Sequence, residues 1–427
     1  MPVSQTDGPV KERPLKILMV DKYYYVKGGP ERYFFEVQKV LERHGHTVIP
    51  FSMADEKNVS TPFADCFVDH IDFDYKNPMQ KLIGAPRAVG RVIYSFHARR
   101  QLEKLIARVK PDVAHLHMID HQISPSILHT LKKHHIPVVQ SVHQYKMVCP
   151  NYRMYIEHKQ EICERCLGGC YHHAVMQRCH KQSLAGSLLV ALESTLHRWM
   201  KLYDSIAAFH VPSRFIGRKL VEGGTDASRV HHQFLTLNLD EYPYHEGFDA
   251  YFLYFGRLSG EKGIKTLIEA VAQMPTHVPC YIVGEGPSRA ELEAYAKGRN
   301  LDQIRFLGYQ SGQALKDLIA KAMFVVVPSE WYENSPLVIY EPFCMGTPVI
   351  GAEIGGIPEF IREGENGWLF PSGDRAALTE RLEWAVTHPK QLLEMGLNAR
   401  RFAELNFTPE RHYQWLHALY CNLIDTF

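Results

Sequence analysis

Residues 251–271 read YFLYFGRLSGEKGIKTLIEAV, and they give the clearest indication of the fold class. Tyr251–Phe255 is an apolar run of strand length, and Gly256–Gly263 is a glycine-rich turn. The helical pattern that follows carries apolar residues at Leu267, Ile268 and Val271. A strand, a glycine-rich turn and an amphipathic helix begin a β–α–β unit, so this part of the chain is predicted to build a parallel sheet.

The same order appears near the start of the chain. A predicted strand, Leu15–Val20, is followed by the turn Lys27–Pro30 and by a helix that ends at Gly45. The next predicted strand is Thr47–Phe51. The other predicted strands are Val113–Leu116, Val138–Ser141, Ile206–Val211, Pro279–Val283, Ile304–Leu307, Phe324–Val327 and Val349–Ile350, and the last predicted helices are Ala376–His388, Gln391–Leu405 and about Pro409–Leu423. The fold class is therefore α/β, with two doubly wound parallel sheets.

The boundary between the two domains is predicted near Asp240–Phe248, where Pro243 and Gly247 break both helix and strand. This gives a first domain over residues 1–245 and a second over 246–408. The segment 149–179 has no clear periodicity and is interpreted as an insertion in the first domain.

Composition limits the classes of function. The 427 residues include 48 Lys plus Arg and 47 Asp plus Glu, a net charge of +1, so no nucleic-acid partner is expected. The longest apolar runs, such as Leu188–Leu192, fall short of the roughly 18 residues that span a bilayer. Met1–Arg13 is polar and lacks the apolar core of a secretory signal. We expect a cytoplasmic protein whose nine cysteines are thiols or metal ligands rather than disulfides.

The turn Gly256–Gly263 suits an anion. Its glycines let backbone N–H groups approach a ligand at a helix N-terminus, which is electropositive. Arg257 and Lys262 flank that point, so the turn is a candidate diphosphate clamp. The alternative is an ordinary strand–helix turn with solvated charges.

A second candidate element is the loop and helix from Glu330 to Gly346. Pro336 suits the first helical position, and Ser335 or Asn334 suits the N-cap. Glu333 would lie just before the helix and Glu341 inside it, where both carboxylates could accept hydrogen bonds from sugar hydroxyls. The alternative for each is simple complementation of the helix dipole.

These motifs, taken in order, resemble those of the retaining GT-B glycosyltransferases of glycosyltransferase family four. The matching pieces are Gly28-Gly29-Pro30-Glu31-Arg32, Gly45-His46-Thr47-Val48, Gly256-Arg257 with Glu261-Lys262-Gly263, Val283-Gly284-Glu285-Gly286-Pro287, Phe306-Leu307-Gly308, Glu333 through Glu341, and Gly355-Gly356-Ile357-Pro358-Glu359. The resemblance implies a GT-B fold, in which two Rossmann-like domains face across a cleft. It further implies an acceptor-side first domain, a nucleotide-sugar-binding second domain and a C-terminal helix, 409–427, that returns to the first.

The resemblance also implies roles for single residues. Arg257 and Lys262 would hold the donor diphosphate, Glu333 the donor sugar and Glu341 the nucleotide ribose. His143 would face the donor sugar, although Gln144 stands where the family usually has an acidic residue. The implied catalytic set is His143, Arg257, Lys262 and Glu333, and the implied donor-binding set is Gly28, Gly29, Gly256, Gly308, Tyr309, Gln310, Asn334, Ser335, Pro336, Leu337 and Glu341.

The implied reaction moves a sugar from a nucleotide-diphosphate-sugar to a glycan or polyprenyl-linked acceptor, with retention of configuration, in bacterial surface polysaccharide biosynthesis. No Asp-x-Asp-type motif lies beside the clamp, so no cofactor is expected for catalysis. Two alternatives stay open: a nucleotide-sugar epimerase of GT-B fold and a non-catalytic sugar-nucleotide sensor. A nicotinamide dehydrogenase is disfavoured because Arg289 occupies the third glycine position after Gly284-x-Gly286.

The cysteines of the insertion point to a metal. Cys149, Cys163, Cys166, Cys170 and Cys179 all fall within 149–179, and Cys163-x2-Cys166 has a bidentate spacing. This predicts a structural four-thiolate zinc site, in which His172, His173 or His180 could replace one thiol. An iron–sulfur cluster is less favoured, and reduced, unliganded thiols are the alternative.

A basic stretch, Lys76–Lys110, carries nine Lys or Arg residues and one acid, Glu103, among interleaved apolar residues. Such a stretch suits peripheral contact with an anionic membrane, here the inner face of the plasma membrane, or a phosphate-bearing acceptor. A solvated helix face over a core is an equal alternative.

Overall fold

The computed structural model describes residues 13–71 and 89–427. The described residues group into two compact units. The first holds residues 13–71, 89–140, 202–207 and 416–427, and the second holds Ser141–Lys201 and Ala208–Trp415. Two six-stranded sheets confirm the predicted α/β class.

The first sheet has the strand order β2-β1-β3-β4-β7-β8, with β1 pairing in parallel with both β2 and β3. Its strands are β1 Lys16–Val20, β2 Thr47–Phe51, β3 Val113–Leu116, β4 Val138–Ser141, β7 Ala208–Val211 and β8 Val230–His232. The helices between them are α1 Gly29–Arg43, α3 Phe96–Val109, α4 Ile127–Lys133 and α7 Arg214–Glu222. All residues of β3, β4 and β7 are buried, as in parallel sheets that helices cover on both faces.

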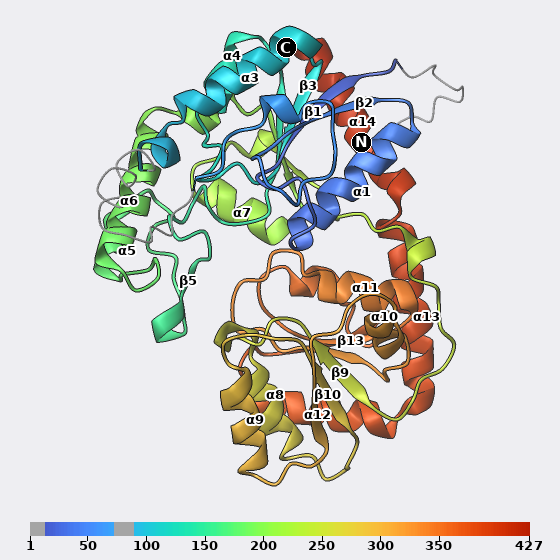
Figure 1. Ribbon diagram of the computed structural model, residues 1–427. Coiled ribbons are helices and arrows are strands. Elements are labelled where there is room, and N and C mark those ends of the chain that lie inside the picture. Colours follow the sequence, from blue (N-terminus) through green and yellow to red (C-terminus); the bar gives the residue numbers. More distant parts are fainter. Residues whose placement is uncertain (1–12, 72–88) are drawn as a thin grey trace. The chain divides into compact units, whose positions relative to one another are not determined.

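The second sheet has the order β11-β10-β9-β12-β13-β14. Its strands are β9 Phe252–Phe255, β10 Cys280–Val283, β11 Ile304–Gly308, β12 Val325–Val327, β13 Val349–Ala352 and β14 Gly367–Phe370. Its helices are α8 Ile264–Val271, α9 Arg289–Lys297, α10 Gly312–Ala320, α11 Leu337–Met345, α12 Arg375–Thr387 and α13 Pro389–Asn406. Figure 1 shows α8, α9 and α12 on one side of this sheet and α10, α11 and α13 on the other.

Strand β9 is the switch point of the second sheet. It pairs in parallel with β10 on one edge and with β12 on the other, so successive connections leave it in opposite directions. Ligands of doubly wound sheets bind outside the carboxyl ends of the strands at such a point. The turn after β9 and the loop after β12 are therefore where a site is expected.

The final helix, α14 Pro409–Thr426, is slightly longer than predicted, and its residues from Leu416 onward belong to the first unit. Within that unit the Tyr420 hydroxyl lies 2.6 Å from Nδ1 of His115 on β3. None of the described helices has the length and apolarity needed to cross a bilayer.

The segment 149–179 has little regular structure, as its lack of periodicity predicts. Strands β5 Tyr155–Ile156 and β6 Glu161–Ile162 form a short antiparallel pair. The helix α5 His172–Met176 follows and packs against α6 Leu184–Trp199.

Candidate functional site

The turn after β9 is fixed against the loop after β12 through the backbone. Gly263 has φ 67°, and a Cβ atom there would collide with the carbonyl oxygen of Pro328. The N–H of Glu330 donates to the carbonyl of Glu261 at 2.9 Å. Because α8 starts directly after Gly263 and no side chain caps it, its first N–H groups remain available to an anion.

Lys262 and Glu333 meet between these two segments. The Lys262 Nζ atom lies 2.6 Å from Oε1 of Glu333, and the Ser329 hydroxyl donates to the same oxygen at 2.8 Å. Burial alone would raise the pKa of Glu333. The Lys262 ammonium, followed by the Trp331 and Ser329 side chains, outweighs burial and holds the pKa of this carboxyl below its ordinary value. Glu333 is therefore an ionised, oriented acceptor at neutral pH.

The start of α11 differs from the prediction by one residue. Pro336 is the N-cap rather than the first helical residue, and no side chain caps the helix. The Ser335 hydroxyl lies 2.7 Å from the Tyr340 hydroxyl, so the predicted capping by Ser335 or Asn334 is wrong. The first backbone N–H groups, around Leu337, are thus a second uncapped helix start beside Glu333.

Glu341 lies one turn into α11 and is buried. The Tyr242 hydroxyl donates to its Oε1 at 3.4 Å, which orients the carboxylate.

His143 lies close to the Glu333 loop within the second unit. The Asn334 side-chain amide donates to the carbonyl of Val142 at 3.0 Å, and the Tyr145 hydroxyl donates to the carbonyl of Tyr332 at 3.2 Å. Burial lowers the pKa of His143 to about 4, so its imidazole is neutral at pH 7. Its neutral ring can exchange hydrogen bonds with a hydroxyl but does not serve as a standing cation.

The remaining predicted donor residues lie at the ends of their strands. Arg257 is exposed, and no carboxylate of the described chain forms an ion pair with it. Gly308 ends β11 with φ 69°, and its carbonyl accepts a hydrogen bond from the N–H of Gly284 at 2.8 Å. Tyr309 is exposed. The side-chain amide of Gln310 donates to the carbonyl of Leu307. Gly28 and Gly29 begin α1 in the first unit, with Gly28 as the uncapped N-cap.

Sequence reasoning missed several supporting residues. Ser329 precedes Glu333 by one turn's spacing, but no pattern singled it out. Glu359 was noted only as part of a motif, yet its carboxylate accepts from the N–H groups of Arg214 and Phe215 at 2.7 Å each and so caps α7. The Ser213 hydroxyl donates to Asn334 at 3.0 Å. Residues so distant in sequence leave no signal in local spacing.

The cysteines of the insertion do not form an assembled metal centre. Over residues 13–71 and 89–427, no group of three or more His, Cys, Asp or Glu side chains is arranged to hold a metal ion. Burial, followed by the neighbouring Cys149 and Cys163 thiols, raises the pKa of both Cys166 and Cys179 to about 12. Cys170 is exposed. The zinc site therefore stays a prediction.

The basic stretch is only partly described, because Lys76, Lys81 and Arg87 lie outside the described residues. In the described part, Lys104 and Arg108 form ion pairs with Asp65 at 2.8 and 3.2 Å. Because these two cations already form ion pairs with an acid of the same chain, they favour the alternative interpretation of the stretch, a solvated helix face over a core.

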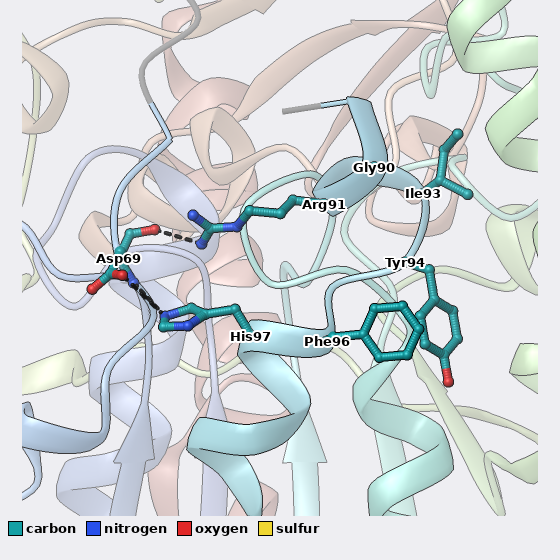
Figure 2. Close-up of a pocket in the computed structure, with 7 residues that line it drawn as sticks. All are labelled: Asp69, Gly90, Arg91, Ile93, Tyr94, Phe96 and His97. Carbon is teal, nitrogen blue, oxygen red and sulfur yellow. Dashed lines mark hydrogen bonds and ion pairs between the residues drawn. The ribbon is translucent and has the colours of Figure 1, made fainter. Parts of the chain in front are cut away.

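Figure 2 shows a pocket of about 380 Å³ in this stretch, where Tyr94 and Phe96 present aromatic rings. Arg91 donates to the Asp69 carbonyl at 2.7 Å, and His97 lies 3.3 Å from the Asp69 carboxylate. The pocket therefore presents aromatic surface beside charges that already have partners.

Comparison with known proteins follows the two sheets. A model described as a glycosyl transferase 4-like domain matches residues 28–232, and one described as glycosyl transferases group 1 matches residues 245–402. Among curated relatives, D-rhamnosyltransferase WbpZ of Pseudomonas aeruginosa is 33% identical over 36% of this chain and 41% of its own length. The amylovoran biosynthesis glycosyltransferase AmsK of Erwinia amylovora is 30% identical over 38% of this chain and 42% of its own length. The chain thus spans less than half the length of these relatives.

Solved structures match over nearly the whole chain. Sucrose-phosphate synthase of Thermosynechococcus elongatus is 19% identical with a TM-score of 0.68, covering 97% of this chain and 100% of that one. HepE of Anabaena, solved in complex with UDP, is 17% identical with a TM-score of 0.62, covering 96% and 100%. At these identities the likeness shows a shared fold. A glycosyl transferase 4-like model matches the first half and a glycosyl transferases group 1 model the second, so the chain is similar to glycosyltransferases along most of its length and has the GT-B fold.

Proposed function

We propose that this chain transfers a sugar from a nucleotide-diphosphate-sugar to a glycan or polyprenyl-linked acceptor, with retention of configuration. The observation that carries the proposal is the Lys262–Glu333 pair at the carboxyl ends of two adjacent strands, β9 and β12. A cation and an ionised acceptor at the switch point suit a ligand with a diphosphate joined to a hydroxyl-bearing ring. HepE, which shares the fold, has been solved with UDP-glucose.

The proposed division of labour takes the roles that the family resemblance implies, and the Lys262–Glu333 contact supports two of them. Arg257, Lys262 and the uncapped starts of α8 and α11 hold the diphosphate and stabilise the charge that develops as it leaves. Glu333 accepts from the sugar hydroxyls, Glu341 accepts from the ribose, and the neutral His143 faces the sugar. The nucleobase is proposed to lie beside Gly308–Gln310.

Retention follows if the acceptor attacks on the face from which the diphosphate departs. The departing phosphate oxygen then takes the acceptor's proton, so the scheme needs no protein base. Assembly of a bacterial surface polysaccharide is the proposed setting. The similarity to AmsK, which is named for amylovoran biosynthesis, and to LpsE of Rhizobium meliloti, named for lipopolysaccharide core biosynthesis, supports that setting.

The test is a panel of UDP-, GDP- and dTDP-sugars, screened first for thermal stabilisation and then for turnover. A donor at about 100 times its dissociation constant adds roughly 2.7 kcal/mol of stability. Transfer to an acceptor, or slow donor hydrolysis without one, supports the proposal, and NMR of the product's anomeric proton gives the stereochemistry. Epimerised donor without acceptor identifies an epimerase. Stabilisation without any turnover identifies a sensor.

We also propose that four of the five insertion cysteines bind a structural zinc ion: Cys149, Cys163, Cys166 and Cys179. Each of these four thiols interacts electrostatically with the other three, whereas Cys170 is exposed to solvent. Burial raises the pKa of the Cys149 thiol, and the backbone N–H groups of Met154, Asn151 and Arg153, which bond to its sulfur, offset part of that rise. Binding requires the four side chains to turn toward a common point.

A further inference from the structure

Helix α6 carries its apolar residues on the outside. The large apolar side chains that face solvent are Leu184, 56% exposed, Leu188, 57%, Leu192, 46%, and Trp199, 79%. The residues that α6 buries are Ser187, Val190, Ala191, Glu193, Ser194 and His197, four of which are polar or charged. A surface helix normally has the opposite pattern, so a demand other than core packing accounts for the outer residues.

The outer residues form one continuous stripe. Leu184, Leu188 and Leu192 follow one another at intervals of four, and Trp199 lies seven residues further, which places all of them on one face. At about 1.5 Å per residue the stripe is roughly 22 Å long. Met176 on α5, which packs against α6, is 69% exposed and widens this surface.

The exposed charges that lie near the stripe in the sequence have one sign. Between Arg165 and Lys201 the sequence contains one acidic residue, Glu193, whose side chain is 0% exposed and lies 2.7 Å from the buried Lys146 ammonium. The exposed charged side chains of the α5–α6 region are Arg178, Lys181, Arg198 and Lys201. The segment that carries the apolar stripe therefore exposes these four cations, and no acid is exposed between Arg165 and Lys201.

We propose that the outer face of α5 and α6 lies in the surface of an anionic lipid bilayer. The leucines and Trp199 would enter the boundary between headgroups and acyl chains, and the four cations would contact lipid phosphates. A second copy of the chain is a poorer occupant, because residues 165–201 expose no acid that could meet the cations of the same segment in the other copy. Membrane binding would place the enzyme where a polyprenyl-linked acceptor lies, and in this respect the inference rests on the proposed function. Binding of the chain to the bilayer itself needs neither donor nor acceptor.

The experiment is co-sedimentation of the full chain with vesicles of phosphatidylcholine alone and with phosphatidylglycerol added. Wild type is expected to bind the anionic vesicles and to be released by salt. Leu188→Glu is expected to bind at least about tenfold more weakly, because a charge replaces a leucine that the bilayer would bury. Leu397→Glu is the matched control: Leu397 is 43% exposed on α13, with acids at Glu394 and Glu404 nearby, and this variant is expected to bind like wild type.

Three results would overturn the inference: wild type that stays in the supernatant, Leu188→Glu that binds like wild type, or light scattering that shows a dimer dissolved by Leu188→Glu. A blue shift of tryptophan emission on binding that Trp199→Phe removes supports it. Turnover on a water-soluble acceptor is measured in parallel. Vesicle binding without turnover would contradict only the proposed function. Turnover without vesicle binding would contradict only the proposal that α5 and α6 bind a bilayer.

Discussion

The ammonium of Lys262 lies 2.6 Å from the carboxylate of Glu333, although 71 residues separate them in the sequence. One side chain comes from the turn after β9 and the other from the loop after β12, and β9 and β12 pair in parallel. The pair keeps Glu333 ionised in spite of its burial. An arriving diphosphate would share this ammonium with Glu333, so the same lysine would hold the leaving group and orient the acceptor of the sugar hydroxyls.

Replacing Lys262 by Ala should lower kcat strongly. Removing one preorganised group that stabilises developing charge costs on the order of 10²–10³ in kcat. Lys265→Ala is the control, because Lys265 is exposed three residues further on and contacts the Tyr295 ring instead. Steady-state kinetics on the best donor from the panel measure both. Equal rates for the two variants would remove Lys262 from the proposed clamp.

The ion pair should also be visible in the pH dependence of stability. The folded pKa of Glu333 lies below the ordinary value of 4.5, so its contribution is fully present above about pH 4.5 and is lost as the pH falls through the folded pKa. The difference in free energy of unfolding between wild type and Glu333→Gln is therefore expected to be constant near neutrality and to shrink in acid. Urea unfolding at a series of pH values measures it, and a difference that grows below pH 4.5 has the wrong sign for this pairing.

The sequence predicted the fold well because its signal is local. The run Tyr251–Phe255 and the turn after it show a strand and a helix start within about twenty residues, and β9 and α8 form there. Lys262 and Glu333 were both selected, yet nothing in their spacing could show that they touch. The start of α11 was misplaced because Ser335 bonds to Tyr340, a partner that competes with capping and becomes visible only once the helix is folded.

The insertion was the least predictable part. Its cysteines gave a clear spacing, but which of them face one another depends on the β5–β6 turn and on α5 packing against α6. The exposed stripe of α6 was hidden for a similar reason, since a helical apolar pattern in sequence does not say which face is buried.

Removing the carboxylate of Glu341 should weaken donor binding more than it slows the chemical step. Glu341→Gln loses a charged acceptor for the ribose, and a hydrogen bond to a charged group is worth about 1.5–3 kcal/mol, or roughly 10- to 150-fold in KM. Tyr242→Phe, which removes only the hydroxyl that bonds to Glu341, should have a smaller effect of the same kind. A fall in kcat with an unchanged KM would contradict this assignment.

The neutral state of His143 predicts a pH profile. With a pKa of about 4, the ring does not titrate between pH 5.5 and 8, so kcat/KM should show no inflection near the ordinary histidine value of 6.5. His143→Ala should lower kcat by losing a contact to the sugar. Profiles of wild type and variant decide the matter, and an inflection near 6.5 that His143→Ala removes would show that the ring titrates during turnover.

The metal proposal makes a prediction that distinguishes between neighbouring cysteines. Cys163→Ser should lose the metal and melt at a lower temperature, because a closed thiolate site contributes its binding free energy to folding. Cys170→Ser should retain the metal and the wild-type melting temperature, because Cys170 is exposed and is not among the four proposed ligands. Elemental analysis and thermal unfolding, with and without a chelator, test both variants. Wild-type protein that contains neither zinc nor iron, and whose unfolding a chelator does not change, would show that these cysteines are unliganded thiols. Their raised pKa values would then reflect burial.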